Sequence, residues 1–177
     1  MSKTIADQIT ERFGLRSEAG ADRAAEGTLA GILGRAVCRK YKPDPIPDEL
    51  MEMLLAAAQS GPTKSNLQQY SILVMSDRGR IAKLAELVPS MPWIAGAPNV
   101  LVFLGDVRRI RRLAEWRGHD YRNNVADTFM NAAVDAAIAL QSFVIAAEAE
   151  GLGICPISYI RNRLEDLQEL LGLPDGV

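Results

Sequence analysis

Three short segments carry the residues whose types and spacing could do chemistry. Residues 34–41 (Gly-Arg-Ala-Val-Cys-Arg-Lys-Tyr) hold two arginines four positions apart, which suits either functional cations or arginines at a helix end that form surface ion bridges. Residues 61–70 hold hydroxyl and amide side chains, which suit either a loop that hydrogen-bonds a ligand or a polar turn. Residues 151–162 open with Gly-Leu-Gly and alone also fit a buried strand after a helix end.

The chain lacks the residues that several common chemistries need. Its one histidine, His119, lies in a polar segment, so a Ser-His-Asp or Cys-His site is a poor fit. One histidine and two dispersed cysteines do not make a zinc site, and we expect no metal. No P-loop is present, and Gly151-Leu-Gly153 lacks the third glycine of a dinucleotide fingerprint. A cofactor enzyme stays open, because a cofactor would itself carry the chemistry.

Size and charge describe an ordinary intracellular domain. The chain has 177 residues, 48% hydrophobic and 24% charged, with a net charge of −2. These values fit one globular domain and give no reason to expect nucleic acid as a partner. The two cysteines lie far apart in the sequence and form no Cys-x-x-Cys motif, and the N-terminus does not resemble a signal peptide. The cytoplasm is therefore the expected location. The basic run at 108–112 is best interpreted as a solvated helix face.

Hydrophobic periodicity predicts one layered domain of mixed helices and strands. Residues 1–30 form a lead-in, helical or mobile, and residues 31–177 form the domain itself. We expect helices at 47–60, 77–87, 107–117, 125–150 and 163–171, and strands at 70–76, 99–105 and 152–158. The strand at 99–105 lacks polar alternation and is expected to be buried on both faces.

The longest predicted helix, 125–150, spans about 39 Å at 1.5 Å per residue. Apolar residues surround most of it, but Asp127, Asn131 and Asp135 form a polar stripe at every fourth position. Gln141 and Ser142 interrupt its most apolar stretch, so we do not expect it to span a membrane. A helix this apolar must be nearly enclosed, and one of the enclosing surfaces is expected to be another subunit.

Together, in their order and spacing, the three segments resemble the flavin-binding segments of the nitroreductase family. The match is closest to the major, NADPH-preferring, oxygen-insensitive group, in which Gly-Leu-Gly precedes and Ile/Leu-Arg-Asn follows the third segment. The stretch from Asn131 to Gly153 is similar to the family's dimer-interface helix. The resemblance implies an α+β fold of the nitroreductase type, with a mixed sheet flanked by helices and a long central interface helix. It also implies a homodimer with FMN at the subunit interface.

The resemblance assigns a role to individual residues. Arg39 corresponds to the cation near the flavin pyrimidine, which stabilises the reduced flavin, and Arg35 to a residue that holds the ribityl phosphate. The backbone N–H of Ser158 or Tyr159 would point at flavin N5, so the candidate catalytic residues are Arg39, Ser158 and Tyr159. The implied cofactor-binding residues are Arg35, Val37, Arg39, Thr63, Lys64, Ser65, Asn66, Pro156, Ile157, Ser158 and Tyr159.

Three departures from the family pattern bear on this assignment. Val37 stands where the family usually has serine, and Tyr159 stands where this group prefers glycine. After Val177 the family continues through an apolar strand to a basic pair that grips the phosphate, so the chain resembles a C-terminally truncated member. FMN affinity is expected to suffer for that reason, and a sheet edge is expected to be unpaired.

The resemblance implies an FMN-dependent oxidoreductase that takes hydride from NADPH or NADH and reduces nitroaromatic, quinone or related acceptors. The alternative is a flavin-binding member of the family without turnover, because the phosphate grip is incomplete. A weaker alternative keeps the enzyme but changes its reaction to dehalogenation or flavin-assisted dehydrogenation, since one fold hosts several chemistries. Neither the acceptor nor the choice between NADH and NADPH follows from the sequence.

Overall fold

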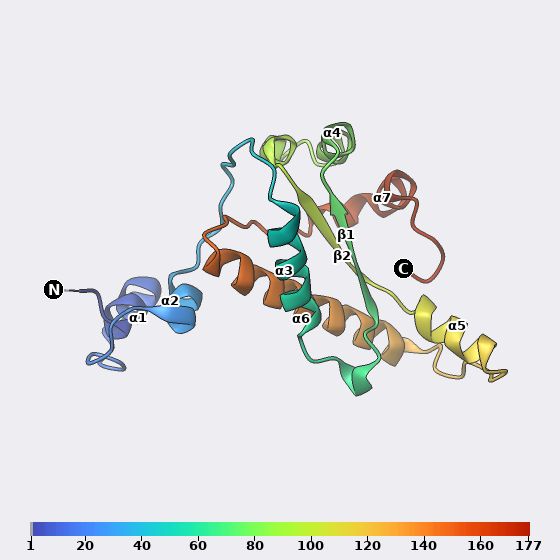
Figure 1. Ribbon diagram of the computed structural model, residues 1–177, viewed down its shortest axis with the longest axis horizontal. Coiled ribbons are helices and arrows are strands. Elements are labelled where there is room, and N and C mark those ends of the chain that lie inside the picture. The colour runs from blue at the N-terminus through green and yellow to red at the C-terminus, as the bar shows by residue number, and fades with distance from the viewer. Residues whose placement is uncertain (1) are drawn as a thin grey trace.

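The computed structural model describes residues 2–177, so the first residue of the predicted lead-in lies outside the described residues. The structure consists of helices arranged around one small sheet (Figure 1). Its elements are α1 (Ile5–Phe13), α2 (Gly27–Gly34), α3 (Asp48–Gln59), η1 (Lys64–Asn66), β1 (Tyr70–Met75), α4 (Arg78–Glu86), η2 (Pro92–Gly96), β2 (Val100–Gly105), α5 (Arg108–Trp116), α6 (Ala126–Ala149), η3 (Tyr159–Arg163) and α7 (Leu164–Leu171).

The two strands pair antiparallel, with Tyr70 opposite Gly105 and Met75 opposite Val100. The helices α3 and α6 pack on one face of this sheet, and α4 and α7 cover the other. On the first face Phe143 of α6 meets the ring of Phe103 edge-on, at 5.7 Å between centroids. Two helix layers therefore enclose a narrow sheet. The helix α6 packs against more of the other elements than any other helix does, namely α2, α3 and both strands.

Small residues along α6 allow the sheet and α3 to approach it closely. Ala132, Ala136, Ala139 and Ala147 are all buried on this helix. A Cβ at Gly105 would lie 3.2 Å from the Cβ of Ala132, so the end of β2 lies directly on the helix. By length and composition α6 is the one helix within residues 2–177 that could cross a membrane, which is weak evidence. Its buried Asp135 and its packing on the sheet are those of a core helix.

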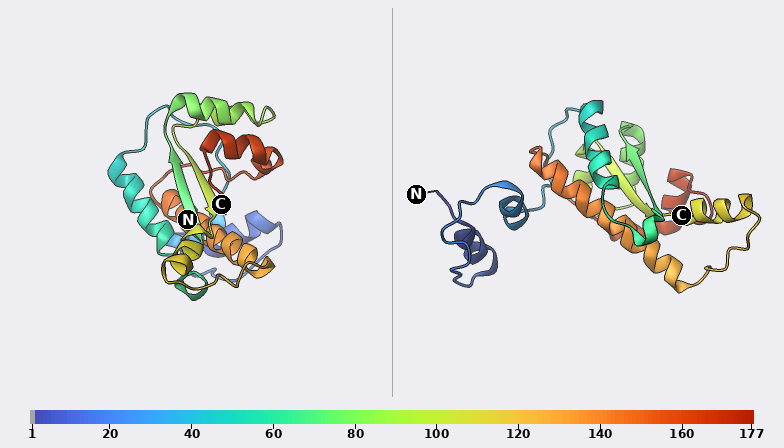
Figure 2. Two further views of the ribbon diagram at one scale, coloured as in Figure 1. Left: turned by 90° about the vertical axis from the view of Figure 1, so that its right-hand side faces the viewer. Right: turned by 60° about the horizontal axis from the view of Figure 1, so that its bottom comes forward.

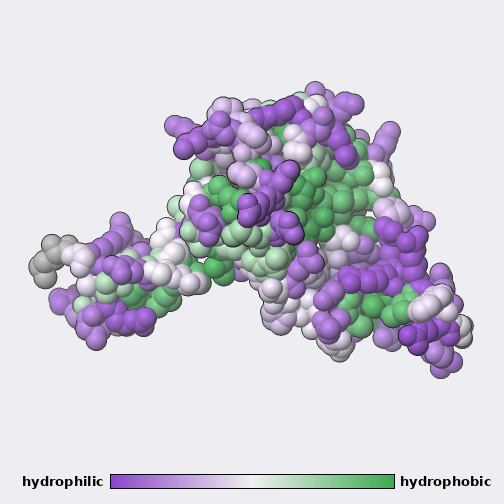
Figure 3. Space-filling view, viewed as in Figure 1, coloured by the Kyte–Doolittle hydropathy of each residue, from purple (hydrophilic) through white to green (hydrophobic). Residues whose placement is uncertain are grey.

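The N-terminal residues form a helical arm that projects from the rest of the molecule (Figures 1 and 2). A capping box between Thr4 and Asp7 starts α1, and its hydrogen bonds hold the pKa of Asp7 below the usual value. The arm meets the body where α2 packs on α6. Apolar side chains stay exposed on the arm (Figure 3), including Phe13 at 63% and Leu15 at 74%.

Three predictions about the sheet need correction or refinement: one of its strands, the direction of pairing and the burial of β2. Residues 152–158 do not form a strand, because their backbone pairs with no sheet strand and makes one bond to Cys38 instead. The sheet within the described residues is consequently antiparallel rather than mixed. The strand β2 is half-buried along its whole length, not fully buried, since the pair of strands gives it only one neighbour. The five helices predicted between residues 47 and 171 are confirmed to within one or two residues.

Candidate functional site

The first and third chemical segments meet beside the C-terminal end of α6. The amide of Cys38 donates a hydrogen bond to the carbonyl of Ile154 at 3.0 Å, across 116 positions of sequence. A Cβ at Gly153 would lie only 2.6 Å from the Cβ and Sγ of Cys38, so this crossing requires a glycine. The first and third segments are therefore joined by a defined backbone contact.

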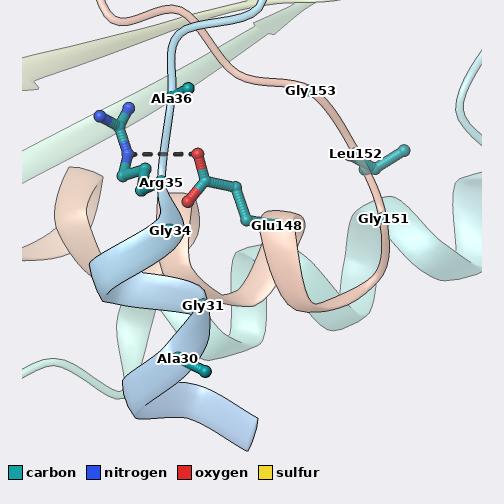
Figure 4. A pocket seen from close by; sticks show the side chains of 9 residues that line it. All are labelled: Ala30, Gly31, Gly34, Arg35, Ala36, Glu148, Gly151, Leu152 and Gly153. Carbon is teal, nitrogen blue, oxygen red and sulfur yellow. Dashed lines mark ion pairs between the residues drawn. The ribbon is translucent and has the colours of Figure 1, made fainter. Parts of the chain in front are cut away.

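A cavity of about 370 Å³ opens where these segments meet the end of α6 (Figure 4). Small residues form most of its wall, and the charged side chains in it are Arg35 and Glu148. Arg35 Nε lies 3.2 Å from a carboxylate oxygen of Glu148, and their side chains are only 23% and 18% exposed. The predicted phosphate ligand Arg35 thus already faces an anion of its own chain.

Within residues 2–177, Arg35 Nε makes no hydrogen bond of acceptable angle, although it is buried. Arg35 Nε lies close enough to Glu148 to form an ion pair, but the geometry is not that of a hydrogen bond from this N–H to the carboxylate. The backbone of Arg35 is fixed from the arm, since Arg12 donates to its carbonyl oxygen at 2.9 Å. An anionic acceptor in the cavity could complete the coordination of this guanidinium.

Arg39 lies next to an aromatic pair. Its guanidinium carbon lies 5.9 Å from the centroid of Trp93, and Tyr41 packs against the same ring at 6.3 Å. Burial, reinforced by the nearby Cys155 and Cys38 and opposed by Arg39, raises the pKa of Tyr41 to about 12. Tyr41 therefore keeps its proton near neutral pH and can act as a hydrogen-bond donor, not as a base.

The second segment is a strained loop held by a buried carboxylate. Ser65, Asn66 and Gln68 all have positive φ values, at 51°, 55° and 50°. Asp135 of α6 is 1% exposed and accepts hydrogen bonds from the backbone amides of Lys64 at 3.1 Å and Gln69 at 3.0 Å. Non-glycine residues rarely adopt this conformation, and such strain concentrates at functional sites.

Side-chain contacts complete this loop. The hydroxyl of Thr63 accepts from the amide of Gln68 at 3.3 Å, and the ammonium of Lys64 lies 3.9 Å from Asp127. Arg109 of α5 donates to the side-chain oxygen of Gln68 at 3.0 Å. The side chains of Lys64, Ser65 and Asn66 are exposed. The loop therefore has a fixed backbone and presents polar side chains outward.

The remaining predicted residues divide between core and surface. Ile157 packs into the hydrophobic cluster under α4 and α7, whereas Pro156 and Ser158 are exposed. Ser158 precedes η3, and its carbonyl oxygen accepts from the amide of Arg161 at 3.1 Å. Tyr159 is 47% exposed and Val37 is 51% exposed. Two of the predicted contacts are thus apolar or aromatic side chains that face outward.

The structure separates the second segment from the other two. Asp135, which holds the loop at 63–69, precedes Glu148 by 13 positions on α6, a distance of about 20 Å along the helix axis. The short helix η1 accordingly lies at the opposite end of α6 from the crossing of Cys38 and Ile154 (Figure 1). Within one chain, therefore, the second segment does not line the pocket formed by the first and third segments.

Comparison with known proteins identifies the class to which this arrangement belongs. The profile of the nitroreductase family matches residues 32–177, and the chain belongs to that family. It is 37% identical over 142 residues to an FMN reductase [NAD(P)H] of Bacillus subtilis, covering 78% of this chain and 57% of that protein. An FMN reductase (NADPH) of the same organism is 36% identical over 152 residues, covering 85% of this chain and 61% of that protein.

Solved structures agree with this assignment. NfrA1 nitroreductase from B. subtilis superimposes with a TM-score of 0.82 at 34% identity, over 85% of this chain and 62% of that one. The NADPH:FMN oxidoreductase from Vibrio harveyi, complexed with NAD+, gives 0.78 at 30% identity, over 84% and 63%. The predicted α+β nitroreductase fold is confirmed. The chain spans about three fifths of the length of these relatives.

Several residues of the site were not predicted from the sequence. Glu148, Trp93 and Gln68 became visible only through their partners Arg35, Arg39 and Arg109. Asp135 did give a signal, as a carboxylate in a helix that is otherwise mostly apolar. Such a residue must find hydrogen-bond donors when it is buried, but the sequence does not say which ones.

Proposed function

We propose that this chain is an FMN-dependent oxidoreductase that transfers electrons from NADPH or NADH to nitroaromatic, quinone or related acceptors. The observation that carries the proposal is the crossing at Cys38 and Ile154, which brings the segment that contains Arg35 and Arg39 against the third segment. Family membership and the names of the FMN reductases among its relatives support it. The free state of both cysteines supports a reducing compartment, and we propose the cytoplasm.

The residues present fit a phosphorylated cofactor. Arg35 lines the cavity, and the small residues around it leave space in which a phosphate could approach its guanidinium. The volume of about 370 Å³ lies within the roughly 300–1,000 Å³ typical of small-molecule sites. When bound, FMN would supply the hydride chemistry that no side chain of this chain can perform.

The chain's own residues would bind, orient and shield the cofactor. Arg35 would hold the phosphate, and Arg39 would place a fixed positive charge beside the ring system. The backbone N–H of Ser158 or Tyr159 would fix the ring's reactive edge, with the exposed Tyr159 ring available to cover one face. The neutral hydroxyl of Tyr41 would remain a donor throughout.

We further propose a homodimer in which the loop at 63–69 serves the partner's site. Its position about 20 Å along α6 from Glu148 supports this, because the loop cannot reach the cavity of its own chain. The apolar residues Phe129, Met130 and Val134 of α6 are 77%, 56% and 50% exposed. A second copy would cover such a face, and Thr63, Lys64, Ser65 and Asn66 would then contact the flavin across the interface.

The direct test is an absorbance spectrum after incubation with FMN and desalting, followed by assays of NADPH and NADH oxidation. We expect a retained flavin spectrum and oxidation that depends on both FMN and a quinone such as menadione. A colourless protein that gains no NAD(P)H oxidation with added FMN would contradict the proposal.

A second candidate is a flavin-binding family member without turnover. The Arg35–Glu148 ion pair favours it, because the carboxylate competes with phosphate for the guanidinium. Stoichiometric flavin without steady-state oxidation of NADPH by menadione would support this candidate over the first.

Removing the competing charge should tighten FMN binding. Glu148→Gln is expected to lower the Kd for FMN about tenfold, because Arg35 then has only one anionic partner, worth about 1.4 kcal/mol. Quenching of flavin fluorescence measures the Kd. Glu150→Gln is the matched control, since Glu150 is exposed at the end of the same helix, and it should leave Kd unchanged. Weaker binding by Glu148→Gln would show that Glu148 supports the site.

A further inference from the structure

The two cysteines of the chain lie on the two segments that cross beside α6. Cys38 belongs to the first segment and Cys155 to the third, and both are free and half-buried. The hydrogen bond from Cys38 N ends on the carbonyl of Ile154, the residue directly before Cys155. The described backbone contains no cis peptide, so that carbonyl oxygen lies on the same side of its peptide as the Cα of Cys155.

This hydrogen bond limits the distance between the two cysteines. Standard bond lengths and an N···O separation of 3.0 Å bring their Cα atoms within about 7 Å, and nearer 6 Å at ordinary hydrogen-bond angles. Disulfides join Cα atoms that are roughly 4.4–6.8 Å apart. The backbone therefore already lies in the range that a disulfide needs.

The side chains also share one neighbourhood. The Sγ of Cys38 lies against Gly153, two positions before Cys155, where no side chain stands in its way. Both cysteines contribute to the raised pKa of Tyr41, which agrees with their lying in one neighbourhood. The Sγ of Cys38 donates to the carbonyl of Lys40 at 3.1 Å, a weak bond that a rotation about χ1 would give up at little cost.

We propose that Cys38 and Cys155 form a reversible intramolecular disulfide when the folded chain meets a peroxide. One thiol loses its proton and attacks a peroxide oxygen as the thiolate, which breaks the O–O bond and gives a sulfenic acid and hydroxide; the hydroxide takes up the released proton to become water. The second thiol then attacks the sulfenic sulfur, and the sulfenic oxygen leaves as another water. Two thiols and one hydrogen peroxide thus give one disulfide and two waters, with two electrons passing to the peroxide. The bond links the two segments that flank the cavity, and its formation does not require flavin.

The test uses the whole reduced chain without FMN. After brief treatment with hydrogen peroxide and alkylation of the remaining thiols, intact mass and peptide mass spectrometry follow the products. We expect a chain lighter by two hydrogen atoms, a peptide pair joined through Cys38 and Cys155, and full recovery with dithiothreitol. Both thiols remaining open to alkylation, oxygen adducts on separate cysteines, or a link between chains would overturn the proposal.

Two controls separate the fold from chance encounter. The same treatment in urea should form the disulfide at least tenfold more slowly, because unfolding removes the crossing. Equal rates in urea would overturn the proposal. In the matched variants Cys38→Ser and Cys155→Ser the remaining thiol should instead give a sulfenic acid or a link between chains. Oxidation should also raise the urea midpoint of the native chain and leave that of the double variant unchanged.

Discussion

Replacing Asp135 by alanine is expected to lower the free energy of unfolding by about 3 kcal/mol, because two backbone donors lose their shared acceptor. The carboxylate is 1% exposed and binds the amides of Lys64 and Gln69. Gln69 is itself 3% exposed, so its amide cannot turn to water when the carboxylate is removed. Urea denaturation followed by circular dichroism measures the change.

Asp127→Ala is the matched control for this substitution. It removes a carboxylate from the same helix, but Asp127 is 56% exposed and lies 3.9 Å from the ammonium of Lys64. Exposed pairs of this kind contribute at most about 1 kcal/mol, so we expect little change in the urea midpoint. Asp135→Asn keeps one acceptor oxygen and should fall between the two. Equal midpoints for Asp135→Ala and Asp127→Ala would show that burial of Asp135 is not what holds the loop.

The same variant also tests the role of the strained loop. Three residues with positive φ persist only while surrounding contacts hold them, and Asp135 supplies two of those contacts. Loss of the carboxylate should let the loop relax, which proteolysis between residues 61 and 70 would detect before global unfolding. If the loop serves a partner's flavin, FMN binding should weaken in parallel.

Helices with a strong hydrophobic period were predictable because the spacing of apolar residues within each helix already defines the face that is buried. The apolar positions of α3 and α6 recur at helical spacing, and both helices begin and end within two residues of the predicted bounds. The run at 152–158 has strand-like composition, yet it forms no strand because it has no neighbouring strand to pair with. Pairing depends on tertiary position, which an apolar run does not encode.

The candidate site was predictable as segments and not as contacts. Arg35, Arg39 and residues 63–66 were singled out through the resemblance to the nitroreductase family, and the structure brings the first and third segments together. The Arg35–Glu148 ion pair joins residues 113 positions apart. Neither residue alone shows that a carboxylate of the same chain will pair with the arginine expected to bind the phosphate. Long-range electrostatics of this kind enters only once the fold is known.

Arg39→Ala is expected to lower kcat/KM for NAD(P)H oxidation by roughly a hundredfold, the lower end of the loss seen when one preorganised electrostatic donor is removed. Arg39 lies 5.9 Å from the centroid of Trp93 and carries the positive charge proposed to stabilise reduced flavin. The flavin reduction potential should fall with it, by about 30 mV for each tenfold change in the two-electron equilibrium. Arg39→Lys keeps the charge and should restore most of the potential.

A second arginine provides the control that isolates this charge. Arg117 also lies over an indole, at 5.2 Å from the centroid of Trp116, so Arg117→Ala removes a charge and a cation–π contact of the same kind. It should leave turnover and potential within experimental error of the parent chain. A purely structural role for Arg39 would reduce bound flavin without moving the potential of the flavin that remains. A shifted potential that lysine restores would instead assign Arg39 an electrostatic role in the reaction itself.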